Sequence, residues 1–389
     1  MSDAGSRGSI KLPGDFFFRE VHTDQKVAHP APPPAPLGPL AAFVGDWVGN
    51  GFNTIFRPNN TATPTPLPNP LPPGDNILEL NLTAEELAFS KNLGSVPNRG
   101  TTPQGDIFLN GVPYLQTIND ITVHGEKVGI HFEPGMWIHV PATTVPPIAQ
   151  ETVARLASIP HGTTIEAQGI IATVAGPPTI NPVDITPFTT APPNTKIKFP
   201  SQTASDPKTA RIPQDLSSFI AAGTITQALL DDPNSLLRSH ISKQKIINTI
   251  ALIISTAPPP PPPLFGGGTD NIAFLLGQAA ATAPNAQATL MTAIFWIETV
   301  EEVLTVPPLK AGQPFTIKAK PSIPGQRVPT FVGSPPFDLD APRKITVHFK
   351  QIQYTQTVML NFATLTWPHV SVNTLVPEDD IVVPASVWK

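Results

Sequence analysis

The sequence predicts a mainly β protein, a closed antiparallel up-and-down β-barrel that carries a helical insert. The 389 residues include 51 prolines and only 14% charged residues, and a proline inside a helix removes one of its hydrogen bonds. Segments rich in β-branched and aromatic residues recur along the chain, and clusters of turn residues separate them. Because no helices alternate regularly with these strands, a closed barrel is expected, with a β-sandwich as the alternative.

The composition excludes several classes of function. The net charge is −5, so the chain lacks the basic excess that binding to nucleic acid requires. It has no cysteine, which excludes disulfides, thiolate catalysis and cysteine-ligated metals. The N-terminus has no apolar core of a signal peptide, and the longest apolar run, 246–256, is too short for a membrane span. We expect a cytoplasmic protein, and the oligomeric state stays open.

The first half of the chain divides into an arm and the first barrel strands. Residues 1–39 are polar and then proline-rich, and Phe16, Phe17 and Phe18 could hold this N-terminal arm against the body. Residues 40–200 form the first part of the barrel. Strands are expected here at 45–56, 76–90, 106–124 and 127–140, and residues 163–176 are expected to form another pair of strands.

An insertion at 201–285 changes the pattern to helical and proline-rich. Asp232 and Pro233 predict the start of a helix, and apolar residues follow helical spacing from there to Ile254, broken by His240 and Gln244. The runs PPPPPP and GGG at 258–268 then act as a stiff and a flexible spacer. Strands resume at 271–276, and residues 286–389 supply the remaining strands at 288–306, 344–365 and 366–375, followed by a C-terminal tail.

Three separated motifs, in the same chain order, resemble those of nitrobindin-like heme-binding β-barrels. GDWVGNG (45–51) resembles the G-x-W-x-G-x-G pattern of that family's first strand, and HFEPGMW (131–137) resembles its H-x-E-x-G-F-W stretch. PHVSVNTL (368–375) resembles its last strand, where a histidine precedes alternating polar and aliphatic residues. The resemblance covers about 40–175 and 344–376.

The resemblance implies a heme-binding protein. It implies heme b in one mouth of a ten-stranded barrel, with His369 as the iron ligand, because the family's last-strand histidine has that role. His131 and Trp137 would then contact the cofactor. The family's chemistry implies reactivity toward nitrogen oxides or peroxide, as a peroxynitrite isomerase or a peroxidase-like enzyme. A neutral imidazole is a good axial ligand for heme iron.

Each of these residues also has a structural interpretation. If His369 points into the barrel, Val370 and Val372 point outward and need a cover, which the insert could supply; otherwise His369 is a surface residue. His131 and Glu133 lie two apart and can share a hydrogen bond, or they form a polar outer face.

Four further residues are candidates for the pocket or for packing. His161 lies in a Pro-His-Gly turn that could border a barrel mouth. Tyr114 and Tyr354 could donate hydrogen bonds to a ligand or pack in the core, and Trp47 is expected to close one barrel end.

Two alternatives to heme follow from the barrel and from the prolines. A heme-free calycin-like barrel would enclose a small hydrophobic ligand, as a carrier or as a cyclase or isomerase. An interaction module would display its proline-rich segments to partners.

Overall fold

The fold is mainly β, with a few short helices. The computed structural model describes residues 35–72, 74–123, 125–145, 147–257, 266–276 and 285–389. Most of the N-terminal arm, including Phe16, Phe17 and Phe18, lies outside these residues, as do PPPPPP and its surroundings.

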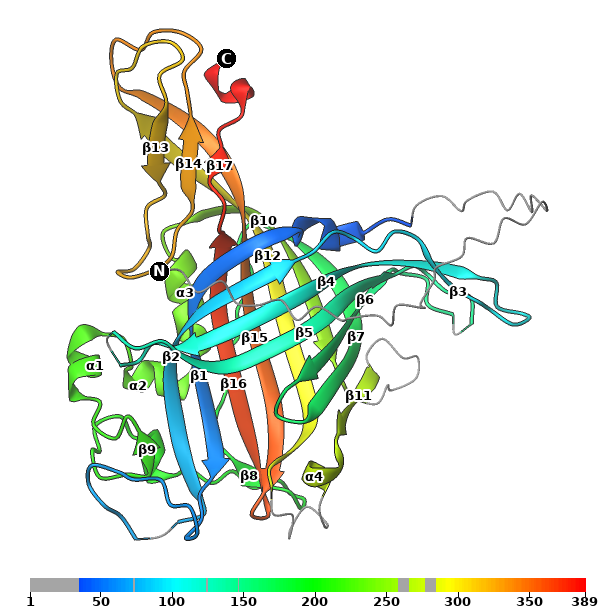
Figure 1. Cartoon of the computed structure of the whole chain (residues 1–389), viewed down its shortest axis with the longest axis vertical. Helices are drawn as coiled ribbons and strands as arrows, with labels where there is room; N and C mark the ends of the chain where they lie inside the picture. The colour runs from blue at the N-terminus through cyan, green and yellow to red at the C-terminus, as the bar shows by residue number, and fades with distance from the viewer. Residues whose placement is uncertain (1–34, 73, 124, 146, 258–265, 277–284) are drawn as a thin grey trace, which may run out of the picture. The chain divides into compact units, whose positions relative to one another are not determined.

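Ten antiparallel strands of the described residues close into a barrel (Figure 1). Each strand pairs with its neighbours in space, and the pairing of β2 with β4 closes the ring. This confirms the predicted closed barrel over the sandwich. In spatial order the strands are β4 (Ile107–Asp120), β5 (Val128–Val140), β6 (Thr152–Ile159), β7 (Thr163–Ala175), β10 (Lys245–Ser255), β12 (Gln287–Val306), β15 (Arg343–Phe362), β16 (Leu365–Pro377), β1 (Gly45–Pro58) and β2 (Asn76–Phe89).

Shorter elements decorate the barrel. A second sheet is formed by β13 (Phe315–Lys318), β14 (Thr330–Gly333) and β17 (Ile381–Val382). The insert contains η2 (Pro200–Gln202), α1 (Ser217–Ala222), α2 (Gln227–Asp231) and α3 (Asn234–Ile241). The others are η1 (Gly38–Ala42), β3 (Val96–Asn98), β8 (Phe188–Thr189), β9 (Arg211–Ile212), β11 (Gly266–Asn271), α4 (Ala273–Leu276) and η3 (Ala385–Trp388).

Three predicted elements inside the insertion are wrong. The helix that starts after Pro233 ends at Ile241, and the apolar run that follows it is the barrel strand β10. Its isoleucines favour a strand because branched side chains lose χ1 freedom in a helix. The predicted GGG spacer begins strand β11, and part of the strand predicted at 271–276 is helix α4.

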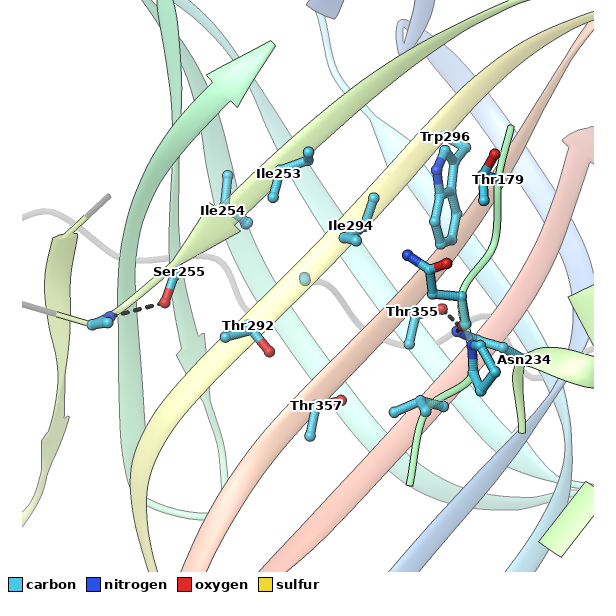
Figure 2. Close-up of a pocket in the computed structure, with 15 residues that line it drawn as sticks. Thr179, Asn234, Ile253, Ile254, Ser255, Thr292, Ile294, Trp296, Thr355 and Thr357 are labelled. Atoms are coloured by element: carbon cyan, nitrogen blue, oxygen red, sulfur yellow. Dashed lines mark hydrogen bonds between the residues drawn. The ribbon is translucent and has the colours of Figure 1, made fainter. Parts of the chain in front are cut away.

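The insert covers the outer wall of the barrel. Val370 and Val372 of β16 are fully buried there, against helix residues such as Leu229 and Leu237. This confirms that the last strand turns its valines outward beneath the insert. Beside α3, the segment 179–183 lies over β10, β12 and β15, and a cavity remains between this segment and the wall (Figure 2).

Polar contacts also fix α3 to the wall. The ring of His240 hydrogen-bonds the Thr374 hydroxyl at 2.8 Å, and the amide of Gln353 donates to the carbonyl oxygen of Leu237 at 3.0 Å. The two positions that interrupt the predicted helical stripe, His240 and Gln244, therefore meet polar groups of the barrel, since Gln244 pairs with Gln351. Such pairs are needed because a buried polar group without a partner costs stability.

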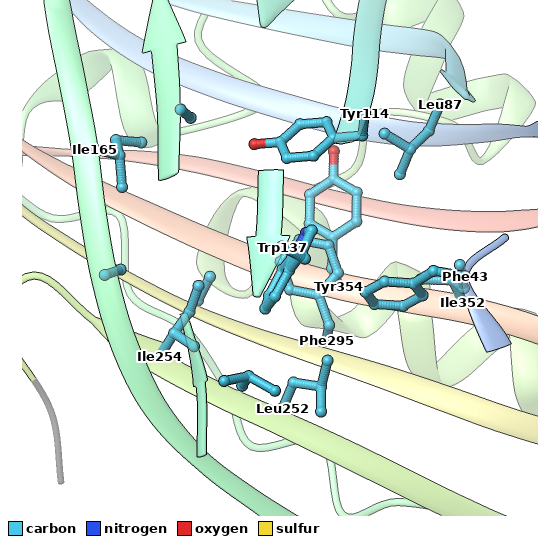
Figure 3. Close-up of a cluster of buried hydrophobic side chains, with 14 of the residues drawn as sticks. Phe43, Leu87, Tyr114, Trp137, Ile165, Leu252, Ile254, Phe295, Ile352 and Tyr354 are labelled. Carbon is cyan, nitrogen blue, oxygen red and sulfur yellow. The ribbon is translucent and has the colours of Figure 1, made fainter. Parts of the chain in front are cut away.

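One end of the barrel interior is filled by large side chains. Phe43, Trp137 and Phe295 pack there with aliphatic residues of several strands (Figure 3), and Trp47 belongs to the same cluster. The indole of Trp47 donates to the carbonyl oxygen of Phe43 at 2.7 Å, which holds the strand to the 3-10 helix before it. Trp47 thus has the packing role predicted for it.

Candidate ligand site inside the barrel

Alternation along the strands stacks the inward residues in layers. On β16 the successive inward residues after Leu375 in the packed end are Asn373, Ser371 and His369. On β5 the corresponding order is Trp137, Gly135, Glu133 and His131. Because side chains of a strand alternate between its two faces, each step of two residues moves one layer further from the packed end.

The first polar layer is a buried ion pair. Arg155 of β6 donates from Nη2 to Glu133 Oε1 at 2.6 Å, and both side chains are buried. Tyr114 also donates to Glu133, while Arg155 reaches Gln356 at 2.5 Å. Burial alone would raise the pKa of Glu133, but the charge of Arg155 and the hydrogen bonds of His131 and Tyr114 lower it to about 2. Glu133 is therefore ionised and paired.

A second buried carboxyl group lies on β2, two strands away from Glu133. Glu85 of β2 accepts hydrogen bonds from Tyr354 at 2.7 Å, Asn373 at 2.7 Å and Gln116 at 2.6 Å. Burial raises its pKa to about 7, although the hydrogen bonds act in the opposite direction. Both tyrosines that were candidates for ligand contact instead donate to these two carboxyl groups.

His369 lies beyond these layers and faces the interior. Its Nε2 is 2.8 Å from Nδ2 of Asn53, which also donates to the Ser371 hydroxyl at 2.8 Å. An amide nitrogen can only donate, so Nε2 accepts and the ring proton of the neutral imidazole is on Nδ1. Asn53 therefore uses both amide hydrogens to orient His369 and Ser371.

The environment of His369 keeps its ring neutral. Burial, followed by the nearby His131 and His161, lowers its pKa to about 3. Both His369 and Ser371 nevertheless keep accessible surface, although they point away from the outer wall. They therefore border space that a water-sized molecule can reach.

The predicted site residues are placed as follows. His131 is near His369, and its Nε2 lies 3.1 Å from Glu133, as their spacing allowed. The ring of His161 is 6.3 Å from that of His131. Trp137 is separate from them, in the packed end of the barrel. The structure thus brings together three histidines from β5, β16 and a turn.

Asn53, Glu85 and Arg155 were not predicted as site residues. Asn53 and Glu85 are polar residues at inward positions of predicted strands, which is a usable signal, whereas Arg155 lies on β6, where no strand was predicted. That signal could be used only once the inward face of every strand was known, because a shift of one residue exchanges the two faces.

Neither a metal-binding cluster nor a membrane-spanning helix is found among the described residues. Among the described residues, no cluster of three or more histidine or acidic side chains has the geometry of a metal site. No helix of the described residues is long and apolar enough to cross a membrane.

No family model, curated protein or solved structure matches the chain.

The site fits heme iron only in part. His369 faces the interior as a neutral ring, which is the form that binds iron. However, the lone pair of Nε2 is engaged by Asn53, and Nδ1 carries the proton. Iron ligation through Nε2 requires Asn53 to turn away, so the arrangement fits a hydrogen-bonded ligand better.

Proposed function

We propose that the chain is a binding protein whose barrel holds a small molecule with an acceptor oxygen, such as a carbonyl group, against His369 and Ser371. The observation that carries this proposal is the double hydrogen bond from Asn53 to these two side chains. It leaves the Nδ1 hydrogen of His369 and the hydroxyl hydrogen of Ser371 as the donors that the pair can offer.

Two properties of the barrel support the proposal. The aromatic packing around Trp47 and Trp137 fills one end, so the accessible space beside His369 has a floor of ordered side chains. The donors are also held in place before any ligand arrives, which lowers the entropy cost of binding. Small-molecule sites commonly combine an apolar enclosure with a few such fixed polar groups.

A matched pair of ligands tests the role of the acceptor oxygen. Acetophenone and ethylbenzene have similar size, but only acetophenone has a carbonyl oxygen. Protein-observed NMR titration should show tighter binding of acetophenone by about fivefold, since one hydrogen bond contributes about 1 kcal/mol.

The variants His369→Phe and Ser371→Ala should each reduce this preference. The control His348→Phe should leave it unchanged, because His348 is on the outer surface beside Glu301. Equal affinity of the wild type for the two compounds, or the same preference in His369→Phe, contradicts the proposal.

Heme is the second candidate, with His369 as its iron ligand. It is favoured by the resemblance of the three motifs and by the neutral, inward-facing His369. Bound heme would supply redox and nitrogen-oxide chemistry, while this chain would supply the imidazole and the pocket around it.

Adding hemin to the purified protein tests this candidate. A Soret band that disappears in His369→Ala is the expected result, and its absence in the wild type refutes heme binding. Asn53→Leu separates the two proposals, because it frees Nε2. It should strengthen the binding of hemin and weaken the binding of acetophenone.

A further inference from the structure

A second pocket lies outside the barrel, between its wall and the segment 179–183. It has a volume of about 470 Å³, within the range of sites for one small organic molecule. The wall is formed by β10, β12 and β15, and Figure 2 shows Ile253, Ile294 and Trp296 facing it. It is separate from the site of His369, which lies inside the barrel on β16.

The roof of this pocket is held by hydrogen bonds. Asn234 donates to the carbonyl oxygen of Asn181 at 2.7 Å, and Arg238 donates to that of Ile180 at 3.1 Å. The backbone N–H of Val183 donates to Asp232 at 3.0 Å. Since α3 is itself fixed to the barrel, the roof and the wall are joined, and the pocket exists before a ligand binds.

The lining determines the kind of ligand. None of the described lining residues is charged, and most of the exposed lining is apolar. A carboxylate or an ammonium group would lose its hydration there without gaining an ionic partner, which is unfavourable. Therefore the pocket selects neutral, mainly apolar molecules.

Two adjacent hydroxyl groups provide a polar spot in this apolar lining. Thr292 of β12 and Thr357 of β15 are directly opposite each other in the strand pairing, and both line the pocket (Figure 2). Directly opposite residues have Cβ atoms about 5 Å apart. Each hydroxyl can donate and accept, so together they can bind one alcohol or carbonyl group.

The geometry points to a binding site for a neutral apolar molecule that carries one alcohol or carbonyl group, seated on Trp296 and the isoleucines and hydrogen-bonded to Thr292 and Thr357. The roofed shape and the small volume favour a single small molecule over a protein segment, because an α-helix alone is about 10 Å wide. The site is independent of the interior site proposed above.

Fluorescence of N-phenyl-1-naphthylamine, a neutral apolar probe, tests this site. The probe should bind saturably, and 1-decanol should displace it at a concentration at least tenfold below that of decanoate or decyltrimethylammonium. Thr292→Phe fills the mouth of the pocket, where Thr292 is exposed, and should weaken probe binding at least tenfold.

The matched control is Thr305→Phe, an exposed position further along the same strand, which should bind the probe like the wild type. The near-isosteric double variant Thr292→Val with Thr357→Val should keep the probe and lose about fivefold in affinity for 1-decanol. Unchanged probe binding in Thr292→Phe, or displacement by decanoate as effective as by 1-decanol, overturns the proposal.

Discussion

Replacing Arg155 by leucine should destabilise the barrel by roughly 3 kcal/mol. Arg155 is buried, and its charge is the largest of the causes that lower the pKa of Glu133 from an ordinary value of 4.5 to about 2, with smaller contributions from His131 and Tyr114. At about 1.4 kcal/mol for each pKa unit, this difference corresponds to roughly 3 kcal/mol for the ionised carboxylate. The value agrees with the typical cost, about 3–5 kcal/mol, of removing one partner of a buried ion pair.

Urea unfolding at pH 7 measures this cost, with tryptophan fluorescence and far-UV circular dichroism recorded together to check for a single transition. The matched control is Arg57→Leu, which removes an ion pair to Glu79 at the surface, where both side chains are about 30% exposed. Exposed pairs contribute about 0–1 kcal/mol. The control should therefore change stability by less than 1 kcal/mol.

A double variant separates the charge effect from lost packing. Arg155→Leu combined with Glu133→Leu removes both buried charges and should be more stable than Arg155→Leu alone, because no unpaired carboxylate remains. The reasoning is refuted if Arg155→Leu costs no more than Arg57→Leu, or if the double variant is less stable than the single one.

Three further predictions concern stability. Burial raises the pKa of Glu298 to about 8, so the free energy of unfolding should fall as pH rises from about 4.5 to about 8. The variant Glu298→Gln should therefore stabilise the protein more at pH 8 than at pH 5, as measured by the midpoints of urea unfolding. The pKa of His369 is lowered instead, so the stability contributed by its neutral ring is fully present above about pH 6.5 and is lost as pH falls toward 3. His369→Gln should flatten the dependence of stability on pH between these values. An unchanged dependence would contradict the placement of His369 as a buried, neutral ring. A Cβ atom on Gly51 would lie 2.1 Å from the backbone oxygen of Val372, so Gly51→Ala should lower stability by about 1–3 kcal/mol, whereas Gly105→Ala, with nothing within 4 Å, should stay within about 0.5 kcal/mol in the same urea unfolding assay.

The glycines of the first strand are required by a neighbour that is distant in the sequence. Gly49 and Gly51 were predicted to be part of a strand, and they are. Glycine is needed because the neighbouring strand approaches closely, since a Cβ atom on Gly49 would lie 2.1 Å from the backbone oxygen of Thr374. The neighbour across the strand pair comes from the far end of the chain. Only the tertiary structure could therefore supply this reason.

The insertion shows where local patterns fail. The run that became β10 has spacing compatible with a helix, and its β-branched composition also suits a strand. Pairing with β7 and β12 on both sides decided between them, because both edges of the strand then gain hydrogen bonds. The short helices α1, α2 and α3 were correctly expected within the insert, but not the barrel strand that follows them.

By itself, the sequence predicted most of the barrel strands, though not β6 or β10, together with the closed barrel and the alternation that puts His369, Ser371 and Asn373 on one face of β16. These are local properties, set by side chains whose period of two matches a strand. Only the tertiary structure decided that this face points inward, because the choice depends on whether the distant insert covers Val370 and Val372. It also decided the chemistry of His369, whose neutral ring and proton position follow from Asn53, which lies more than three hundred residues away in the chain.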